Sequence, residues 1–412
     1  MTDRQTPEWD EATLADVVDP GRPITYGIVQ PGPRQEEGVG IPIIRGQDYG
    51  NGVVRSHSLY WVSPEIAASY KRSVVRRGDL LISIVGVYVG TIGEVPAALD
   101  GANLTQTTAR LAIRADLDSR FFFHQLISPA FQREVSRFTK GSAQPGLNLS
   151  DVEWMRVVIP PLHEQRRIAA ILDTIDETIQ ATEGLVTKLT VTAMGLATIA
   201  VAAAVAGGGI GSIGQIADGA AGSLVQTGPF GSQLHASDYV GEGVPTFMPT
   251  DISGGRLDLL GAAKITESKA NELSRHRLRT GDVLFGRRGD LSRCAVVPSD
   301  ASGGLCGTGC LLVRIPQNVL AADWLALVYR HDFVQRQVLG RAVGTTMLNL
   351  SGGLIRSLLI PLPTEQSELL MTAFRSNEQR REIESENLSK LRELRAGLAA
   401  DLLSGRVRTV AA

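Results

Sequence analysis

The longest regular pattern in the chain is a series of apolar and small residues that recur in alternating steps of three and four. The series comprises Ile168, Leu172, Ile175, Ile179, Thr182, Val186, Leu189, Ala193, Leu196, Ala200 and Ala203. Such steps place the side chains on one stripe of a helix that meets one partner helix. The pattern predicts a helix from Gln165 to Val205, about 60 Å long, which the glycines from Gly207 to Gly209 end.

A second long helix is predicted near the end of the sequence. Pro363 precedes Thr364, a residue suited to the N-cap, and Glu365 and Glu368 follow in the first turn, where the helix dipole favours acidic groups. Leucines continue the helix at positions 388, 391, 394, 398 and 402, and Gly405 ends it. Two long helices of similar length most simply pair with each other, in an orientation that the sequence leaves open. We expect their interface to contain Ile168, Leu172, Ile175, Ile179, Val186, Leu189, Leu196, Leu388, Leu391, Leu398 and Leu402.

One part of the first helix is long enough to span a membrane. Leu189 to Ala217 form a stretch of 29 residues without a charge. The stretch consists mainly of Ala, Thr, Val and Gly, whereas Leu, Ile and Phe supply most of the free energy of membrane insertion. We therefore expect no membrane association.

The chain repeats itself after about 200 residues. Three matched pairs of segments keep the same order in both halves: Ile159–Gln165 with Ile360–Gln366, Leu147–Ser150 with Leu348–Ser351, and Arg76–Leu81 with Arg279–Leu284. The first two pairs are separated by 201 residues, and the glycines of the third pair by 203. A duplicated unit explains this order better than chance does.

Each copy has the same predicted content. Short β-type runs, Gly-rich turns and short helices come first, and an apolar strand, a proline break and the long helix close the copy. The β-type runs are Leu80–Val89, Ala109–Ile113, Val283–Phe285 and Leu311–Ile315, and the closing strands are Val157–Ile159 and Leu358–Ile360. We expect a mixed α/β (α+β) fold with globular domains at 1–160 and 207–361 and long helices at 161–206 and 362–412.

Composition adds little about partners. The 412 residues suffice for two or three domains, and 43% hydrophobic with 20% charged residues are ordinary globular values, which excludes a disordered chain. The formal charge of −2 gives no sign of a nucleic-acid partner, although 35 of the 41 basic residues are Arg, the side chain suited to bidentate recognition of guanine and phosphate. Three cysteines and a beginning without signal-peptide features favour a cytoplasmic location.

Motifs for catalysis are weak. Gly209–Gly214 fits the G-x-G-x-x-G pattern, but a predicted helix precedes it where a dinucleotide site needs a strand, so we interpret it as a linker. The three cysteines lack the second ligand pair of a structural zinc site and are interpreted as buried small residues. Pro249–Asp251 with Glu267–Lys269 weakly resembles a metal-dependent nuclease cluster. The sequence contains no P-loop, nucleophile elbow or amino-methyltransferase motif, and so favours binding over catalysis.

Several motifs point to one family when they are taken together. Both long helices begin after I-P-x-[PL]-x-E-Q, the chain is a two-fold repeat, and the second helix closes with Leu402–Val407. Each domain also opens with characteristic segments: Ile24–Gly32 and Gly40–Arg45 in the first, and Gly228–Leu234, Asp238–Tyr239 and Gly243–Pro245 in the second. Over essentially its whole length the chain resembles the specificity (S) subunit of Type I restriction–modification systems.

The resemblance implies a division of labour. Two target-recognition domains each read one half of a bipartite double-stranded DNA site, and the two helices pair as an antiparallel coiled coil that spaces the domains. The helices also dock two methyltransferase (M) subunits, which bring S-adenosylmethionine and methylate adenine. Motor-nuclease (R) subunits, which use ATP and Mg, can join. The specificity subunit itself is not an enzyme and holds no cofactor.

Candidate DNA-binding residues follow from side-chain chemistry. The densest basic clusters are Lys71, Arg72, Arg76 and Arg77 in the first half, and Arg275, Arg277, Arg279, Arg287, Arg288 and Arg293 in the second. Polar loop residues favoured for base reading are Gln106, Thr107, Ser142, Gln144, Gln233, Thr345 and Thr346. Solvated surface charge and turn formation are the alternative roles of these residues. For the chain as a whole, a coiled-coil adaptor without DNA contact and a self-sufficient DNA nuclease remain the alternatives.

Overall fold

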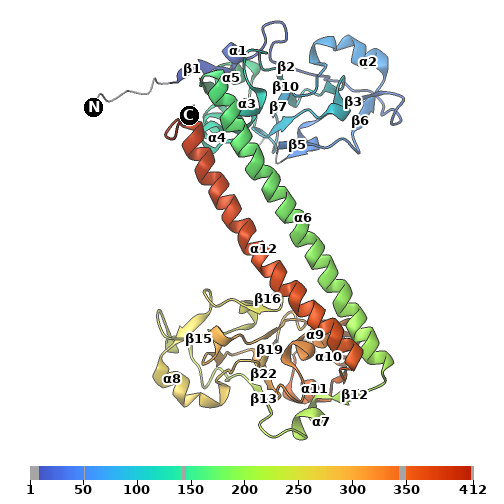
Figure 1. Ribbon diagram of the computed structural model, residues 1–412, viewed down its shortest axis with the longest axis vertical. Coiled ribbons are helices and arrows are strands. Elements are labelled where there is room, and N and C mark those ends of the chain that lie inside the picture. The colour runs from blue at the N-terminus through green and yellow to red at the C-terminus, as the bar shows by residue number, and fades with distance from the viewer. Residues whose placement is uncertain (1–8, 51, 142–144, 343–348, 410–412) are drawn as a thin grey trace, which may run out of the picture. The chain divides into compact units, whose positions relative to one another are not determined.

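The computed structural model describes residues 9–50, 52–141, 145–342 and 349–409. The chain divides into two compact units: unit 1 comprises residues 1–184 and 385–412, and unit 2 comprises residues 185–384. Each unit therefore holds one globular domain together with part of each long helix (Figure 1).

Unit 1 is built around a six-stranded sheet in the order β2-β10-β7-β8-β5-β4. These strands are β2 (Thr25–Tyr26), β10 (Thr108–Leu111), β7 (Leu80–Ser83), β8 (Ile92–Glu94), β5 (Gly52–Val54) and β4 (Tyr49–Gly50). A second sheet has the order β6-β3-β9, and β1 pairs with β11. These strands are β6 (Tyr60–Val62), β3 (Ile41–Ile44), β9 (Asn103–Leu104), β1 (Asp10–Thr13) and β11 (Arg156–Ile159). Because β2 and β7 both pair antiparallel with β10, their carboxyl ends lie at the same end of the sheet.

Short helices pack on the sheets of unit 1. They are α1 (Leu14–Val17), α2 (Pro64–Ser69), α3 (Ser119–Ile127), α4 (Pro129–Phe138) and α5 (Leu149–Glu153), with short 3-10 turns at Gly46–Asp48, Lys71–Ser73 and Ala97–Leu99. Helix α3 begins where the Asp118 carboxylate accepts a hydrogen bond from the backbone N–H of Phe121 (2.9 Å). Phe121, Phe122 and Leu126 of α3 are fully buried in one core with Leu80 of β7, so apolar burial fixes this helix on the sheet.

Unit 2 has a four-stranded sheet in the order β13-β22-β19-β20, made of β13 (Leu224–Thr227), β22 (Cys310–Arg314), β19 (Val283–Gly286) and β20 (Cys294–Val296). A second sheet, β14-β18-β15-β21, contains β14 (Tyr239–Val240), β18 (Ala263–Ile265), β15 (Val244–Phe247) and β21 (Leu305–Cys306). Two strand pairs complete it: β12 (Ile210–Ser212) with β23 (Leu359–Pro361), and β16 (Ile252–Ser253) with β17 (Arg256–Leu257).

The helices of unit 2 pack on its sheets. They are α7 (Ile213–Asp218), α8 (Glu267–Glu272), α9 (Ala322–Arg330), α10 (Asp332–Ala342) and α11 (Gly352–Ser357), with 3-10 turns at Ala236–Asp238, Pro249–Asp251, Ser274–His276 and Ser299–Ala301. Trp324 and Tyr329 of α9 are buried in the core, and each finds a polar partner: Trp324 Nε1 donates to the Pro361 carbonyl (3.0 Å) and Tyr329 Oη to the Leu291 carbonyl (2.5 Å).

The two units have matching strand orders. The series β2-β10-β7-β8, β6-β3-β9 and β1-β11 in unit 1 correspond to β13-β22-β19-β20, β18-β15-β21 and β12-β23 in unit 2. A local turn matches too, because the Asp79 carboxylate accepts a hydrogen bond from the backbone N–H of Arg76 (2.7 Å) and the Asp282 carboxylate from that of Arg279 (2.7 Å). The predicted β-type runs contain the central strands of these sheets, although the run Leu80–Val89 extends beyond the end of β7 at Ser83.

The predicted linker at Gly209–Gly214 is wrong. The segment contains β12, which pairs antiparallel with β23, and α7 begins directly after it. The Ser212 hydroxyl caps α7 by accepting a hydrogen bond from the backbone N–H of Gln215 (3.1 Å). Three paired residues show too little alternation to be seen in a sequence, and their partner strand lies about 150 residues away.

The two long helices have nearly the predicted bounds: α6 runs from Leu162 to Ala206 and α12 from Glu365 to Leu403. Thr364 and Ser367 form a reciprocal cap, with Thr364 Oγ1 accepting from the backbone N–H of Ser367 (3.2 Å) and Ser367 Oγ from that of Thr364 (2.7 Å). Gly208 and Gly405 follow the helices with φ of +76° and +74°, the left-handed conformation that ends a helix.

Each unit contains a contact between α6 and α12. In unit 1 Asp176 of α6 accepts from Arg395 of α12 (2.9 Å), and Glu183 accepts from Arg392 (2.6 Å), so these two helix segments run antiparallel. In unit 2 small residues of α6, including Ala200, share a buried cluster with Met371 of α12. Of the expected interface residues, Ile168, Leu172, Leu189 and Leu402 are buried, and Ile175, Ile179, Val186, Leu196, Leu388, Leu391 and Leu398 are half-buried.

Among the residues that the structure describes, α6 is the one helix long and apolar enough to cross a membrane. Its most apolar window of 18 residues has a mean hydropathy of 2.0, and 22% of that window is buried. Packed helices of soluble proteins meet the same criterion, and in unit 2 Ala200, Val201 and Ala204 lie within the hydrophobic core. The window alone therefore does not assign α6 to a membrane.

Candidate nucleic-acid interface

Three loops of unit 1 meet at the sheet end where β2 and β7 finish. The backbone N–H of Gln106 donates to the Ile28 carbonyl (3.1 Å), which joins the segment before β10 to the loop after β2. The loop after β7 is attached on the other side, because the Ile84 N–H donates to the Thr107 carbonyl (2.9 Å) and the Ile84 carbonyl accepts from the Leu147 N–H (2.9 Å). The Gln106 side chain is exposed between these loops, where a ligand can reach its amide.

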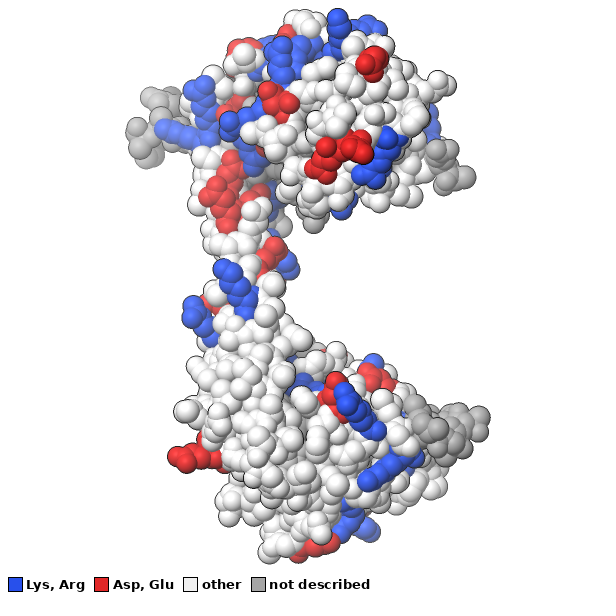
Figure 2. Space-filling view, turned by 90° about the vertical axis from the view of Figure 1, so that its right-hand side faces the viewer, with Lys and Arg blue, Asp and Glu red and all other residues white. Residues whose placement is uncertain are grey.

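A groove of about 1100 Å³ lies beside β2. Its lining includes Tyr26 and three exposed basic residues, Lys71, Arg72 and Arg76, which follow α2. Figure 2 shows Lys and Arg side chains at several places on the visible surface of this globular domain, with Asp and Glu among them. Cations at the edge of a groove suit the phosphates of a nucleic acid.

The floor of this groove holds a buried arginine. Arg110 of β10 donates from Nη1 to the carbonyls of Arg72 (2.6 Å) and Val74 (2.8 Å), so its guanidinium fixes the turn that carries the exposed cations. Burial lowers the pKa of Arg110, and the positive charge of Arg22 acts in the same direction. Arg22 itself makes a bidentate ion pair with Asp79 (2.8 and 2.6 Å).

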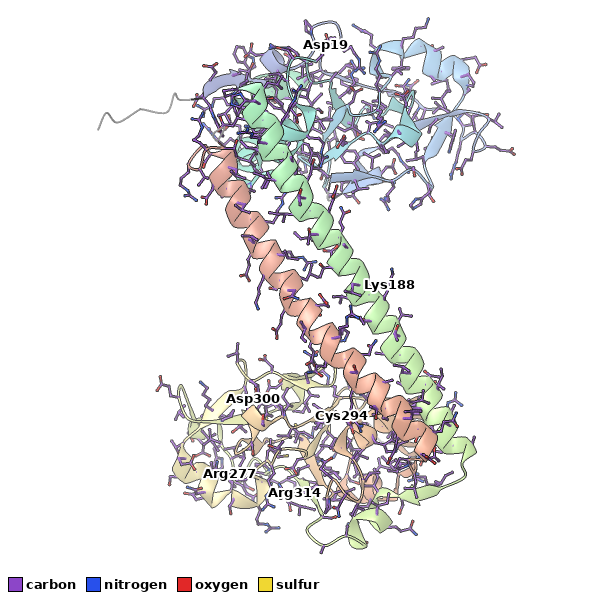
Figure 3. The ribbon with its side chains drawn as sticks, in the orientation of Figure 1. Asp19, Lys188, Arg277, Cys294, Asp300 and Arg314 are labelled. Carbon is purple, nitrogen blue, oxygen red and sulfur yellow. The ribbon has the colours of Figure 1, made fainter. Side chains whose placement is uncertain are left out.

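Unit 2 uses a similar pair. Arg314 of β22 donates to both oxygens of Asp282 (2.7 Å each), and its Nη2 also reaches the Arg277 carbonyl (3.1 Å). Arg277 and Arg314 lie in the same part of the unit (Figure 3). The exposed cations of unit 2 include Arg275 beside this pair and Arg288 after β19.

The structure separates the predicted DNA-binding residues into three groups. Exposed and available to a ligand are Lys71, Arg72, Arg76, Arg77, Gln106, Arg275, Arg279 and Arg288. Thr107, Gln233, Arg277, Arg287 and Arg293 hydrogen-bond to their own unit. Ser142, Gln144, Thr345 and Thr346 lie outside the described residues. Arg77 lines a cavity of about 950 Å³ other than the groove that Lys71, Arg72 and Arg76 share.

Members of the second group show why turn formation competes with DNA contact. Gln233 Oε1 accepts from the backbone N–H of Phe230 (3.1 Å), which closes its own turn. Arg277 Nη1 donates to the Gly303 carbonyl (2.6 Å), and its Nη2 pairs with Glu267 (2.5 Å). Arg293 Nη1 donates to the Pro249 carbonyl (3.0 Å). These guanidinium groups fix loops of unit 2.

Sequence reasoning missed Arg110 and Arg22. Both are single basic residues outside any cluster, and their partners lie 38 and 57 residues away along the chain. The one signal was the position of Arg110 in the middle of an otherwise apolar strand, where a buried charge requires partners.

The weak nuclease and zinc candidates have ordinary structural roles. Asp251 accepts a hydrogen bond from the backbone N–H of Met248 (2.7 Å), and Glu267 pairs with Arg277 (2.5 Å). The three cysteines are free and buried, and burial raises the pKa of Cys294 to about 12. No group of three metal-ligating side chains occurs in the described part of the chain.

Part of this chain is similar to known proteins. Residues 7–191 match the model of the Type I restriction modification DNA specificity domain. A curated relative, the EcoBI specificity subunit of a Type I restriction enzyme from Escherichia coli, is 33% identical over 191 residues, which cover 44% of this chain and 40% of that protein. The MjaVIII specificity subunit from Methanocaldococcus jannaschii is 23% identical over 145 residues, 34% of each chain.

Solved structures extend the likeness of the fold to the whole chain. The S subunit of a Type I restriction–modification system from M. genitalium has a TM-score of 0.64 at 13% identity, over 98% of both chains. A chain from a structure of a Type I restriction–modification complex has a TM-score of 0.53 at 17% identity, over 98% of this chain and 99% of that one. These two structures therefore share the fold described above.

Proposed function

We propose that this chain is the DNA-recognition subunit of a Type I restriction–modification complex, in which each globular domain reads one half of a bipartite double-stranded DNA site. The proposal rests on one observation: residues 7–191 match the model of the specificity domain, and unit 2 has strand orders that match those of unit 1. Two recognition domains of one architecture suit a target with two halves. Exposed loop side chains read bases, and the cations beside them hold phosphates.

In this proposal α6 and α12 pair as an antiparallel coiled coil that sets the spacing between the half-sites. The order of the ion pairs of unit 1 supports the antiparallel direction, since Asp176 pairs with Arg395 and Glu183 with Arg392. The buried or half-buried state of the predicted seam residues supports close helix packing.

The helices also dock two methyltransferase subunits, which supply S-adenosylmethionine and methylate adenine, and motor-nuclease subunits with ATP and Mg complete the restriction complex. The chain itself performs no catalysis and acts in the cytoplasm. Support for docking comes from exposed apolar side chains on α6, Val191, Met194 and Ile199. In Figure 2 most of the visible surface of unit 2 is uncharged, as expected from a sequence without charge between Leu189 and Ala217.

Co-expression with the cognate adenine methyltransferase tests the proposal. We expect a stoichiometric complex and, by methylome sequencing, a bipartite methylation motif. Exchange of residues 1–160 for the matching domain of a relative with a different motif is expected to change one half of the motif and to leave the other half intact. An unchanged motif after this exchange contradicts the proposal.

Two alternatives have separate tests. A coiled-coil adaptor without DNA contact predicts that the assembled complex binds DNA no better than the methyltransferase alone, and steep salt-dependent binding by the complex would exclude it. A self-sufficient nuclease predicts Mg²⁺-dependent cleavage by the purified chain. The involvement of Asp251 and Glu267 in local hydrogen bonds and ion pairs argues against that alternative.

A further inference from the structure

The loop after β7 in unit 1 and the loop after β19 in unit 2 occupy matching positions but carry different side chains. Ile84 N–H donates to the Thr107 carbonyl in unit 1 (2.9 Å), and Arg287 N–H donates to the Gly309 carbonyl in unit 2 (2.8 Å). The Ile84 carbonyl accepts from Leu147 N–H (2.9 Å), and the Arg287 carbonyl accepts from Leu350 N–H (2.9 Å). These bonds align Ile84 with Arg287 independently of the sequence repeat.

The next residues differ in the same way. Val85 bridges to Gly146 in unit 1, and Arg288 bridges to Asn349 in unit 2. Each loop then reaches a glycine with positive φ, Gly86 at +85° in unit 1 and its counterpart in unit 2 at +75°. One framework therefore presents an apolar pair in unit 1 and an arginine pair in unit 2.

The apolar loop of unit 1 continues into two exposed side chains. Val87 is 87% exposed and Tyr88 is 44% exposed. They are the central residues of a turn that is closed by a hydrogen bond from Val89 N–H to the Gly86 carbonyl (3.1 Å). The exposed valine and tyrosine lie next to each other on this turn, where they can form a contact surface.

The position of this turn argues for DNA as its occupant. The turn belongs to the same hydrogen-bonded loop cluster as Gln106, whose exposed amide can bond to a base edge. The matching loop in unit 2 carries Arg288 at the position of Val85, and Arg288 is exposed and has no carboxylate partner in the described part of the chain. A cation at that site suits a polyanion far better than an apolar protein surface.

We propose that the two domains read their half-sites with different chemistry: Val87, Tyr88 and Gln106 select A·T pairs in one half-site, and Arg288 selects guanine in the other. The proposal rests on the proposed function. A glutamine amide pairs with adenine N6 and N7, apolar side chains contact the thymine methyl group, and a guanidinium pairs with guanine O6 and N7. The neighbouring Arg287 is held within unit 2, because its Nε donates to the Leu350 carbonyl (3.0 Å).

The test is methylation of a randomised DNA library by the complete complex of this chain with its cognate methyltransferase. We expect Arg288→Ala to reduce the preference for guanine at one position of the unit 2 half-site by about 5- to 150-fold and to leave the other half unchanged. Gln106→Ala and Tyr88→Ser are expected to relax A·T positions of the unit 1 half-site only. Arg275→Ala is the matched control, an exposed cation that should lower methylation of all sequences alike.

Three outcomes overturn the proposal in distinguishable ways. Variants that lower methylation uniformly, with both half-sites unchanged in sequence, overturn the assignment of base readers and leave the proposed function standing. If the Tyr88→Ser variant loses the methyltransferase during gel filtration and its base preference is unchanged, the turn is a contact for that protein. This result overturns the assignment of the turn as a base reader. A wild-type complex without any bipartite motif overturns the proposed function itself, and the further inference with it.

Discussion

Nε2 of His124 lies 2.8 Å from Oδ1 of Asp173, and the side chain of His124 is fully buried. The contact joins α3 of the first globular domain to α6. Arg120 of α3 pairs with the same carboxylate, while Asp176 Oδ2 lies 3.8 Å from the other ring nitrogen of His124 and Arg395 Nη2 of α12 lies 3.4 Å from it. Three helices of unit 1 thus meet at one polar cluster.

The cluster predicts how stability depends on pH. The pKa of His124 is lowered from its ordinary value of about 6.5 because desolvation by burial outweighs the attraction of Asp173. Below about pH 6.5 the imidazole of the unfolded chain binds a proton, whereas that of the folded chain stays neutral until the pH reaches its lowered pKa. The free energy of unfolding therefore falls as the pH drops from about 6.5 towards the lowered pKa. We expect the thermal unfolding temperature of wild type to fall more between about pH 7.5 and 5.5 than that of His124→Gln.

The exposed residue His57 provides the control. His57→Gln should keep the full wild-type pH dependence when unfolding is followed by circular dichroism. If the pH dependence of the unfolding temperature weakens equally in both variants, or does not weaken in His124→Gln, burial of a neutral imidazole at position 124 is the wrong explanation.

A second prediction concerns the segment after α12. Arg408 donates to both oxygens of Glu164 (2.9 Å each), and Trp9 Nε1 donates to the same carboxylate (3.1 Å). The Glu164 side chain is almost fully buried. Arg408→Met leaves this carboxylate short of its charged partner, so we expect the free energy of unfolding to fall by about 1–3 kcal/mol, measured by urea denaturation.

Arg406, two residues earlier, gives the comparison for that variant. Its side chain is 71% exposed and pairs with Asp401 at the surface. Arg406→Met should change the free energy of unfolding by less than about 0.5 kcal/mol. Equal losses in the two variants would mean that the segment acts through its backbone and not through the buried carboxylate.

The long helices and the main strands could be predicted because their signals are local. The seam from Ile168 onwards, the Thr364 cap and the glycine after each helix report on neighbours within a few residues. The matched Gly-Asp turns also appear in sequence, since Asp79 and Asp282 cap residues only three positions earlier. Periodicity and caps are thus enough to place the scaffold.

The candidate interface could be predicted only in part, because charge alone does not show which arginines already bond to other groups of the protein. Arg277 and Arg293 were grouped with Arg288 by composition, yet the first two bond to carbonyls 26 and 44 residues away. Such partners depend on which loops the fold brings together. Tyr88 was missed for the opposite reason, because a tyrosine among apolar residues is typical of a core and its exposure follows from a turn geometry that the sequence does not state.

The cationic groove of unit 1 leads to a prediction about salt. Replacing Lys71, Arg72 and Arg76 together by Ala should weaken binding of the assembled complex to duplex DNA of any sequence, because these side chains contact phosphates in the proposed function. Each lost phosphate contact reduces the slope of log K against log salt by about 0.9, so the slope should fall by about 3 at most. Fluorescence anisotropy over a salt series measures it.

Arg137 is the matched control for the groove. It is an exposed cation of the same unit, located on α4 and paired with Glu134, away from the groove lining. Arg137→Ala should leave both affinity and slope unchanged. For the isolated chain we expect weak DNA binding, because its formal charge is only −2 and no domain is strongly basic; nanomolar affinity at physiological salt would contradict this expectation.

A final prediction follows from two ion pairs of opposite polarity. In unit 1 the domain contributes the base and the helix the acid, Arg120 with Asp173, whereas in unit 2 the domain contributes the acid Asp323 and α12 the base Arg375. Asp323→Arg places two guanidinium groups together and should lower the free energy of unfolding, and adding Arg375→Asp should recover part of the loss. Because both side chains of this pair are partly exposed, we expect a coupling of only about 0.5–1 kcal/mol in a double-mutant cycle measured by urea denaturation. Additive losses in the double variant would mean that apolar packing, rather than charge, holds this domain on its helix.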